Sequence, residues 1–425
     1  MAEKIFRARE ACLDSLVNYE KHKKYSNIEL SASIDKYNFD DLERRLFTKL
    51  FYGVIEKKLT LDFYIGCLSE KKNKDPFVTN ILRIGLYQIL YMDKIPESAA
   101  CDESVKLAKN LKNIKAAGYI NAVLRNFLRK REELEDKLKN LNDLEIKYSC
   151  SSDIIRIWTD SYGEKITEKI LKTDQKKQGF TIAVNSLKIL KDEYIKHLET
   201  DFEKINGYGV KILEDLPIKN LYGYDEGLFF VQDGASQACA EETGAKPGDI
   251  VIDCCAAPGG KSFYMAQMMQ NKGRIICFDI HRNRLDLIET SAKRLGIDII
   301  ETYENDSSVN SGEFENLADA VLCDVPCSGF GAIGKKPEIK YKTQSEISKL
   351  PKLQLKILSA SANYVKSGGT LVYSTCTLNK EENEGIIEKF ICENKNFEQI
   401  YSHTFFPFER ETDGFFIVKM KRIGV

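Results

Sequence analysis

Two cysteines stand where a thiol could act on a substrate. Cys327 lies in the run Asp324-Val325-Pro326-Cys327-Ser328-Gly329, and Cys376 lies in Ser374-Thr375-Cys376-Thr377. Each run ends a short apolar stretch that is predicted to be a strand, so each cysteine falls on a loop just beyond it. A thiolate on such a loop can attack an electrophilic carbon. A buried cysteine is more often a small hydrophobic residue, which is our interpretation of Cys12, Cys67 and Cys277.

A second candidate site is the run Asp253-Cys254-Cys255-Ala256-Ala257-Pro258-Gly259-Gly260-Lys261. It follows the apolar residues 250–252 and precedes an amphipathic segment, so it forms the turn of a strand–turn–helix unit. In a parallel sheet such a turn offers backbone N–H groups to a ligand, and its glycines allow a close approach. The spacing matches neither the dinucleotide motif G-x-G-x-x-G nor the triphosphate motif G-x-x-x-x-G-K-[ST]. An ordinary strand–helix turn is the alternative.

Three acidic residues, Asp279, Asp306 and Asp324, follow successive predicted strands. Because the carboxyl ends of parallel strands form one crevice, all three are expected to face a single ligand. Asp279 is placed to accept hydrogen bonds from ribose hydroxyls, and Asp306 to meet a base or its exocyclic amine. A single carboxylate is more typical of a helix cap or a surface residue. Three of them at matching strand ends favour a ligand site.

The ligand that these residues favour is a nucleoside with a positive charge. Two glycines, a proline-stiffened loop and several carboxylates suit such a ligand better than a phosphate-bearing one. S-adenosylmethionine, with its sulfonium group, is such a nucleoside. Lys261 does not suit a cation, so we expect it to serve the substrate or a carboxylate.

Strands and helices alternate after residue 232, which predicts a doubly wound, mostly parallel α/β sheet. The predicted strands are 250–253, 274–279, 297–303, 318–324, 370–374 and 415–421. The predicted helices between them are 262–270, 282–295, 345–365 and 381–392.

The chain before this region is expected to form two further parts. Residues 1–140 are predicted to be an all-α bundle, with helices at 41–58, 98–110 and 117–130. Residues 141–232 are predicted to be a helical connector and a small α+β piece, with strands at 180–184 and 227–231 and a helix near 190–198. The third part is then residues 233–425.

The first part is also the basic part of the chain. Residues 1–140 hold 27 Lys and Arg and 21 Asp and Glu, whereas the whole chain has a net charge of −1. A basic strip at 125–131 (Arg125, Arg129, Lys130 and Arg131) could lie along a phosphate backbone, and a solvated helix face is the alternative for each residue. This asymmetry is a mild indication of an RNA-facing end.

Composition excludes several other classes of protein. Of the 425 residues 43% are hydrophobic and 30% charged, as in a globular protein, and nothing resembles a signal peptide or a membrane span. A cytoplasmic protein is therefore expected. Twelve cysteines without C-x-x-C pairs do not suggest a disulfide framework. The four histidines lie far apart in the sequence and match no zinc-ligand spacing, so no metal site is expected.

The runs DCCAAPGGK, DVPCSG and STCT, in this order, resemble the signatures of the RNA cytosine-C5 methyltransferases. Residues 81–88 and 118–125 resemble the NusB-like domain of one branch, the bacterial 16S rRNA methyltransferases B, also called Sun or Fmu. The match covers essentially the whole chain. It implies a Rossmann-like methyltransferase domain preceded by a NusB-like, RNA-binding helical domain.

The resemblance also implies a reaction and its residues. In this family a thiolate adds to carbon 6 of cytosine, carbon 5 then takes a methyl group from S-adenosylmethionine, and loss of the carbon-5 proton and of the thiolate restores the ring. The motif cysteine that acts as nucleophile corresponds to Cys376, and Cys327 is implied to help release the product. Asp324 is implied to bond the cytosine edge. The residues implied to line the donor site are Cys255, Ala256, Ala257, Pro258, Gly259, Gly260, Lys261, Asp279, Asp306 and Asp324.

The implied substrate is a cytosine of 16S rRNA, cytosine 967 by family resemblance, in RNA that is free or incompletely assembled. Because a cytosine inside a duplex exposes no face to a thiol, the target must be single-stranded or flipped out. Phe330 and Tyr341 could stack on it or pack in the core. No membrane or metal partner is expected, and the protein is expected to be a monomer.

Three alternatives stay open. The same reaction could act on tRNA or another RNA, because the motifs determine the reaction better than the substrate. A non-catalytic RNA-binding or antitermination factor is a second alternative, although such a relative should lack one of Cys327, Cys376 or Asp324. A nicotinamide-dependent oxidoreductase is disfavoured by the missing G-x-G-x-x-G motif.

Overall fold

The structure, a computed structural model, describes residues 2–22, 26–69, 75–110, 114–173, 179–214, 216–410 and 412–424. The chain divides into two compact units. One comprises residues 1–156 and 335–343, and the other comprises residues 157–334 and 344–425. The first is the helical unit and the second is the α/β unit.

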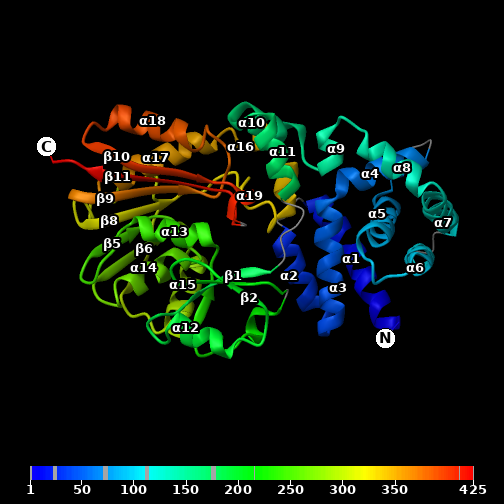
Figure 1. The fold of residues 1–425 in the computed structure, drawn as a ribbon, viewed down its shortest axis with the longest axis horizontal. Helices are drawn as coiled ribbons and strands as arrows, with labels where there is room; N and C mark the ends of the chain where they lie inside the picture. Colours follow the sequence, from blue (N-terminus) through cyan, green and yellow to red (C-terminus); the bar gives the residue numbers. More distant parts are fainter. Residues whose placement is uncertain are drawn as a thin grey trace. The chain divides into compact units, whose positions relative to one another are not determined.

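The helical unit is a bundle around one central helix, α5 (Pro76–Tyr91) (Figure 1). Asp75 caps its N-terminus by accepting a 2.9 Å hydrogen bond from the N–H of Phe77, and Pro76 occupies the first turn, where no backbone donor is needed. Residues 80–89 of this helix are all buried, as expected for a helix that is surrounded by others. The other helices are α1 (Ala2–His22), α2 (Ser26–Tyr37), α3 (Asp41–Glu56), α4 (Lys58–Leu68), α6 (Glu97–Asn110), α7 (Ile114–Arg129), α8 (Arg131–Lys139), α9 (Leu144–Tyr148) and α10 (Ser152–Tyr162), the last of which crosses the boundary at residue 156.

Residues 335–343 belong to the helical unit although they follow the loop of Cys327 in the chain. The Glu338 carboxylate accepts hydrogen bonds from the N–H and the hydroxyl of Ser26, at 3.3 and 2.7 Å. The Tyr341 hydroxyl lies 2.6 Å from the carbonyl oxygen of Ile55 and 2.8 Å from the hydroxyl of Ser149. These contacts hold residues 335–343 among helices from the N-terminal part of the chain.

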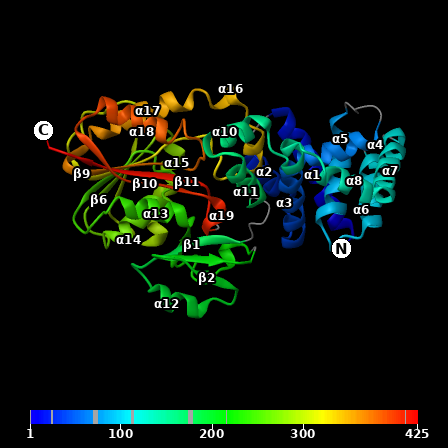
Figure 2. The same ribbon diagram turned by 45° about the horizontal axis from the view of Figure 1, so that its top comes forward.

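The α/β unit begins with α11 (Glu164–Thr173) and a small antiparallel sheet in the order β2-β3-β1-β4 (Figure 2). Its strands are β1 (Phe180–Val184), β2 (Phe202–Lys204), β3 (Gly209–Ile212) and β4 (Phe229–Val231). β1 was predicted with the same bounds, and β4 within two residues. α12 (Lys191–Tyr194) lies where a helix was predicted, and continues as a 3₁₀ turn to His197.

The main sheet has seven strands in the order β10-β11-β9-β8-β5-β6-β7. The five strands β5 to β9 run parallel, and β11 pairs antiparallel with both β9 and β10. The strands are β5 (Ile250–Asp253), β6 (Arg274–Asp279), β7 (Ile300–Glu304), β8 (Ala318–Asp324), β9 (Val365–Thr375), β10 (Phe397–Phe405) and β11 (Phe415–Arg422). The predicted doubly wound α/β fold is confirmed.

Helices cover both faces of this sheet, because side chains alternate along its buried strands. Val251 and Ile275 join the core under α13 (Gly234–Glu242), α14 (Gly260–Met268) and α15 (Arg282–Leu295). Their neighbours Ile252 and Ile276 join the core under α17 (Leu350–Ala362) and α18 (Glu384–Glu393). The sheet therefore holds the carboxyl ends of β5, β6 and β8 rigidly between two apolar layers.

One predicted helix is divided. The segment predicted as a helix at 345–365 forms α16 (Gln344–Ile347) and then α17, because Pro351 sits in the first turn of α17 and favours a new start there. Residues from 365 onward belong instead to β9, which begins five residues before its predicted start.

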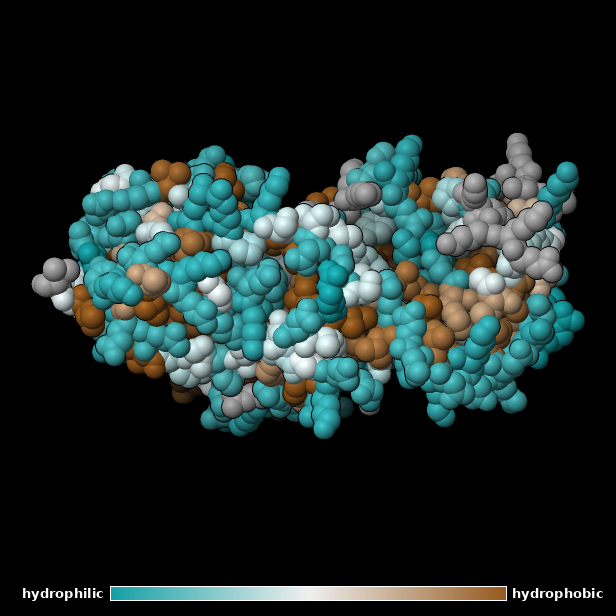
Figure 3. All heavy atoms as spheres, turned by 90° about the horizontal axis from the view of Figure 1, so that it is seen from above, coloured by the Kyte–Doolittle hydropathy of each residue, from teal (hydrophilic) through white to brown (hydrophobic). Residues whose placement is uncertain are grey.

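Hydrophilic residues cover most of the surface of the α/β unit on the face in Figure 3. Among the described residues, no helix has the length and apolar character that crossing a bilayer requires.

Candidate active site

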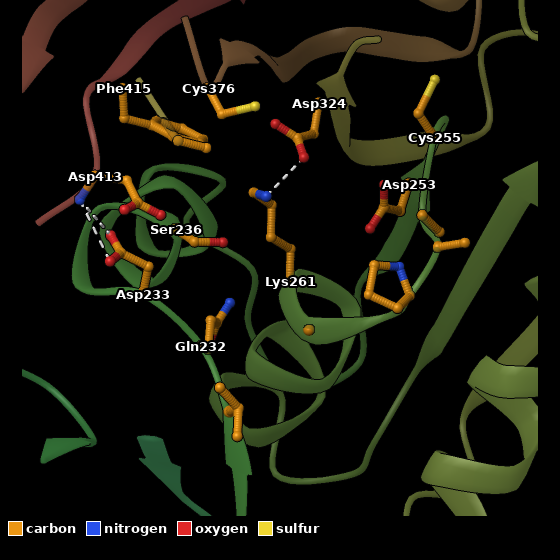
Figure 4. A pocket seen from close by; sticks show the side chains of 16 residues that line it. Gln232, Asp233, Ser236, Asp253, Cys255, Lys261, Asp324, Cys376, Asp413 and Phe415 are labelled. Atoms are coloured by element: carbon orange, nitrogen blue, oxygen red, sulfur yellow. Dashed lines mark hydrogen bonds and ion pairs between the residues drawn. The ribbon is translucent and has the colours of Figure 1, made fainter. Parts of the chain in front are cut away.

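A cavity of about 260 Å³ opens in the α/β unit beyond the carboxyl ends of β5, β8 and β9 (Figure 4). Eight of the residues predicted for the site line it: Cys255, Ala256, Ala257, Pro258, Gly260, Lys261, Asp324 and Cys376. Eight further residues complete the lining: Val231, Gln232, Asp233, Ser236, Asp253, Ala332, Asp413 and Phe415. The three sequence runs therefore meet at one place.

The turn after β5 is held in shape by its backbone. Ala256 donates to the carbonyl of Phe278 on β6, and Gly259 donates to the carbonyl of Ala256, at 2.9 and 2.7 Å. Gly259 has φ +102°, which L-residues rarely adopt, and a Cβ there would lie 2.5 Å from the ring of Phe263. This position thus requires glycine, and the turn leads directly into α14 at Gly260.

Lys261 and Asp324 form a partly buried ion pair across the cavity. The ammonium of Lys261 donates to Oδ2 of Asp324 at 2.6 Å (Figure 4). The hydroxyl of Ser374 donates to Oδ1 of the same carboxylate at 2.8 Å. Burial by itself would lower the pKa of Lys261, but the Asp324 carboxylate overcomes this effect and raises that pKa above its ordinary value. The lysine therefore stays protonated and holds the carboxylate in one orientation.

The two cysteine sulfurs lie 3.2 Å apart, within hydrogen-bonding distance. The hydrogen bond from Cys327 lowers the pKa of the Cys376 thiol, against the opposite effect of burial, and Lys261 lowers it further. The same hydrogen bond and burial raise the pKa of Cys327 well above its ordinary value. The pair therefore favours a thiolate on Cys376 and a proton on Cys327.

Cys327 does not line the cavity, although its sulfur contacts the sulfur of Cys376, which does. The loops of the two cysteines are also joined by the backbone, because Gly331 donates to the carbonyl of Cys376 at 3.0 Å. The Ser328 and Thr377 hydroxyls lie 2.6 Å apart, which adds a side-chain link.

Asp279 and Asp306 do not line the cavity. Asp279 ends β6, is 4% exposed, accepts from the N–H of His281 and forms a 2.9 Å ion pair with Arg284. Arg284 also donates to the carbonyl of Ala257 in the turn. Asp306 accepts from the N–H of Ser308, and hydrogen bonds from Ser308 lower the pKa of Asp306. The predicted roles of both acids toward a ribose and a base stay predictions.

Of the eight lining residues that the sequence prediction missed, three are acidic, namely Asp253, Asp233 and Asp413. Asp253 is the last residue of β5, and its position before the glycine turn was the available signal. Burial raises the pKa of Asp253 to about 6, and its Oδ1 atom has no hydrogen-bond partner. Asp413 donates its N–H to Asp233, which joins the start of β11 to α13. Nothing near Asp413 in the sequence indicated this position.

Phe330 and Tyr341 pack in cores and do not line the cavity. Phe330 is 2% exposed and packs edge-on against Trp158 at 6.5 Å. Tyr341 belongs to the helical unit, where it contacts Ile55 and Ser149. Of the two alternatives, core packing thus holds for both: Phe330 is buried in its unit, and Tyr341 is half-buried against the core of the helical unit.

The residues around the turn fit S-adenosylmethionine. This donor has a cationic sulfonium and amine and two ribose hydroxyls, which suit carboxylate acceptors. The unpaired Oδ1 of the buried Asp253 offers such an acceptor in the cavity, and Gly259 and Gly260 leave the backbone of the turn bare. Within the described part of the chain, no group of three or more His, Cys, Asp or Glu could hold a metal ion.

The structure has a doubly wound sheet, a glycine turn after its first parallel strand and two paired cysteines at the next strand ends. These are the features that the resemblance to the Rossmann-like RNA methyltransferases implies. Comparison with known proteins agrees with this class. Residues 244–421 match the family of 16S rRNA methyltransferase RsmB/F, and residues 7–129 match the NusB family.

The relatives extend the match to nearly the whole chain. The probable ribosomal RNA small subunit methyltransferase B of Bacillus subtilis (strain 168) is 34% identical over 98% of this chain and 99% of its own length. The ribosomal RNA small subunit methyltransferase B of Escherichia coli O1:K1 / APEC is 30% identical over 89% of this chain and 91% of its own length. The crystal structure of PH0851 has a TM-score of 0.80, 26% identity and 98% coverage of both chains.

The chain belongs to the ribosomal RNA small subunit methyltransferase B family. S-adenosylmethionine is the cofactor.

Proposed function

We propose that this protein transfers a methyl group from S-adenosylmethionine to carbon 5 of a cytosine in small-subunit rRNA, through a covalent adduct between Cys376 and carbon 6. The observation that carries the proposal is the 3.2 Å contact between two cysteine sulfurs at the edge of a cavity lined by Lys261 and Asp324. The names of the relatives support rRNA as the substrate, and the family resemblance implies cytosine 967 of 16S rRNA.

The chain's own residues account for the addition step. A cytosine ring is too electron-poor at carbon 5 to attack a methyl donor unaided, so a nucleophile must first add to carbon 6. Cys376 is the better nucleophile of the pair because the hydrogen bond from Cys327 lowers the pKa of its thiol. Its sulfur adds to carbon 6 and leaves carbon 5 electron-rich.

Asp324 and Lys261 act on the opposite edge of the ring. Addition to carbon 6 leaves negative charge on carbon 5 that is shared with N3, where a fixed cation or donor lowers the barrier. Lys261, kept protonated by Asp324, can stabilise that charge, and the carboxylate can accept from the amine. When bound, S-adenosylmethionine supplies an electrophilic methyl group to carbon 5.

Release completes the cycle on the protein side. Loss of the carbon-5 proton and departure of the Cys376 sulfur restore the aromatic ring. Cys327 holds a proton next to that sulfur, so we assign it to this step. A leaving thiolate that accepts this hydrogen bond is a better leaving group than a bare one.

We propose that residues 1–140 bind RNA, that residues 141–232 connect this part to the catalytic part, and that residues 233–425 bind the donor and carry the chemistry.

Two of the four cations of the predicted basic strip already have acidic neighbours. Arg125 lies 3.7 Å from Asp102, and Arg131 lies 2.7 Å from Glu97. Arg129 and Lys130 are exposed and better available to phosphates. Action as a cytoplasmic monomer on free or incompletely assembled rRNA is part of this proposal.

The test separates the roles of the two cysteines. With Cys376→Ala, transfer of labelled methyl to rRNA should stop while calorimetry still detects donor binding. With Cys327→Ala, a slower-moving protein–RNA adduct should accumulate on a denaturing gel, because release is slowed. Full methylation by Cys376→Ala would remove it as the nucleophile, and an absent adduct with Cys327→Ala would contradict the release role. Methyl mapping on total RNA of cells with and without the protein identifies the nucleotide and distinguishes rRNA from tRNA.

A further inference from the structure

A buried carboxylate, Glu382, lies behind the two cysteines. It is 0% exposed and is located between the loop of Cys376 and α18. Its Oε2 accepts from the N–H of Ser328 and from the side-chain amide of Gln354, both at 2.8 Å, and its Oε1 accepts from Asn379 at 2.9 Å. A carboxylate with three hydrogen-bond donors inside a core has both oxygens satisfied, and it holds those donors in one geometry.

The donors surround Cys327 on both sides. Ser328 follows it in the chain, and Gln354 donates the second hydrogen of the same amide group to the carbonyl of Pro326, which precedes it, at 2.9 Å. The peptide groups before and after Cys327 are therefore tied, directly or through Gln354, to one carboxylate. The backbone of Cys327 cannot shift without breaking one of these bonds.

The same carboxylate is linked to the other cysteine loop. Asn379, which donates to the carboxylate, lies three residues after Cys376. The carbonyl of Glu382 accepts from the hydroxyl of Tyr373, which lies on β9 three residues before Cys376. Asn383, the next residue, donates to the carbonyl of Thr377 at 3.0 Å. Glu382 is thus a further point at which both cysteine loops are joined, behind the direct links of Gly331 to Cys376 and of Ser328 to Thr377.

We propose that Glu382 is a positioning residue that keeps the Cys327 sulfur against the Cys376 sulfur and keeps their shared proton on Cys327. This inference rests on the proposed function, in which the two sulfurs have different tasks. The charge of Glu382 contributes to raising the pKa of Cys327, after the hydrogen bond to Cys376 and burial. An anion on the Cys327 side of the pair repels a thiolate there and so favours the thiolate on Cys376.

Other charged groups face the pair and do not replace this effect. Asp324, Asp413 and Lys261 act on Cys376 from the cavity side. Asp324 also acts on Cys327, and Cys327 and the hydroxyl of Tyr373 act on each other. Among the groups that act on these two sulfurs in the described structure, Glu382 is the carboxylate that also bonds the backbone next to Cys327.

The test uses Glu382→Gln, which keeps the size of the side chain and removes its charge, with Glu381→Gln as the matched control. Glu381 is the preceding carboxylate on the same turn and is exposed. The first measurement is the rate at which the full-length protein forms an adduct with RNA that contains 5-fluorocytosine, where release is blocked. We expect at least a tenfold slower rate for Glu382→Gln and an unchanged rate for the control, with donor affinity within twofold of wild type for both.

The second measurement is one that loss of packing alone would not change. Limited alkylation with iodoacetamide, followed by mass spectrometry, gives the ratio of modified Cys376 to modified Cys327. We expect this ratio to fall at least fivefold in Glu382→Gln, because the thiolate is no longer confined to Cys376. If Glu382→Gln does not fold, Gln354→Met, which removes the bonds to Pro326 and Glu382, is measured instead and should change the ratio in the same direction.

A wild-type ratio and a wild-type adduct rate in the folded variant would overturn the inference. The proposed function has its own separate outcome in this experiment. If the wild-type protein forms no adduct with the fluorinated RNA, the covalent mechanism fails. If the wild-type protein forms the adduct but the alkylation ratio is unchanged in Glu382→Gln, only the role of Glu382 is refuted and the covalent mechanism stands.

Discussion

Cys376 and Cys327 share one hydrogen bond, and this bond makes the rate of adduct formation depend on pH. The pKa of Cys376 is lowered, so its thiolate is present above that lowered value and is lost as pH falls through it. Cys327→Ala removes the donor, so the pKa of Cys376 rises and the acidic limb of the profile should move to higher pH. Cys327→Ser, which keeps a donor, should move it less.

The measurement is the single-turnover rate of adduct formation between pH 6 and 9, which does not depend on release. An acidic limb at the same pH in all three proteins would mean that the hydrogen bond does not control the thiolate.

Asp253 gives a second effect of pH at the residue scale, on stability. Burial raises the pKa of Asp253 to about 6, about 2 units above that of an exposed aspartate. The folded state then binds a proton more tightly than the unfolded state, so this contribution to stability is present at low pH and is lost as pH rises toward 6. Asp253→Asn cannot ionise. It should therefore gain stability relative to wild type between pH 4 and 7, by up to about 3 kcal/mol.

Urea unfolding of both proteins at several pH values measures this difference. Asp225→Asn, at an exposed position, is the control and should show no such trend. A constant difference between Asp253→Asn and wild type from pH 4 to 7 would contradict the raised pKa.

At the scale of elements, the turn between β5 and α14 depends on one glycine. Gly259→Ala combines an unfavourable φ of +102° with a contact at 2.5 Å to the ring of Phe263, and strain of this kind costs about 1–3 kcal/mol. Because the turn also forms the donor side of the cavity, we expect lower thermal stability and weaker donor binding together.

Gly244→Ala separates the effect of an unfavourable φ from the effect of a close side-chain contact. Gly244 also has a positive φ, +64°, but a Cβ there meets nothing within 4 Å. We expect this variant to lose a little stability and to keep its donor affinity. Equal donor affinity in Gly259→Ala and wild type, measured by calorimetry, would show that the turn can move aside.

The elements that carry the site were predictable because short-range patterns determine them. β5, β6 and β8 are apolar runs followed at once by Asp253, Asp279 and Asp324, and parallel strands bring such ends together. β10 was not predicted, because it is an edge strand with a long exposed stretch at 398–402 and shows no alternation. β2 has three residues, too few to show a period.

The residues around the cysteines were less predictable than the cysteines themselves. Glu382, Gln354 and Asp413 act through contacts that join positions 28 to 180 apart in the chain. Nothing in the local pattern distinguishes a buried glutamate from its exposed neighbour Glu381. Only the packing of α17 and α18 on the sheet decides which of the two is enclosed.

At the scale of the whole molecule, the division of the chain does not follow sequence order. Residues 335–343 belong to the helical unit, but Gly334 and Gln344 on either side belong to the α/β unit. Deleting residues 1–140 is therefore not a clean removal of an RNA-binding domain, since it would also remove Ser26 and Ile55, the partners of Glu338 and Tyr341. A point variant is the better test of how the two units are linked.

Tyr341→Phe removes the hydroxyl that lies 2.6 Å from the carbonyl of Ile55 and 2.8 Å from the hydroxyl of Ser149. A buried polar group that loses its partner costs about 1–3 kcal/mol, so we expect lower stability. The segment 335–343 begins eight residues after Cys327 in the chain, so its loosening should also slow adduct formation with 5-fluorocytosine RNA, while donor affinity is unchanged. Tyr222→Phe, at a tyrosine that is 46% exposed in the α/β unit, is the control and should match wild type in all three measurements. A destabilised Tyr341→Phe that forms the adduct at the wild-type rate would show that the helical unit holds this segment for stability alone and that the cysteine loop keeps its geometry without it.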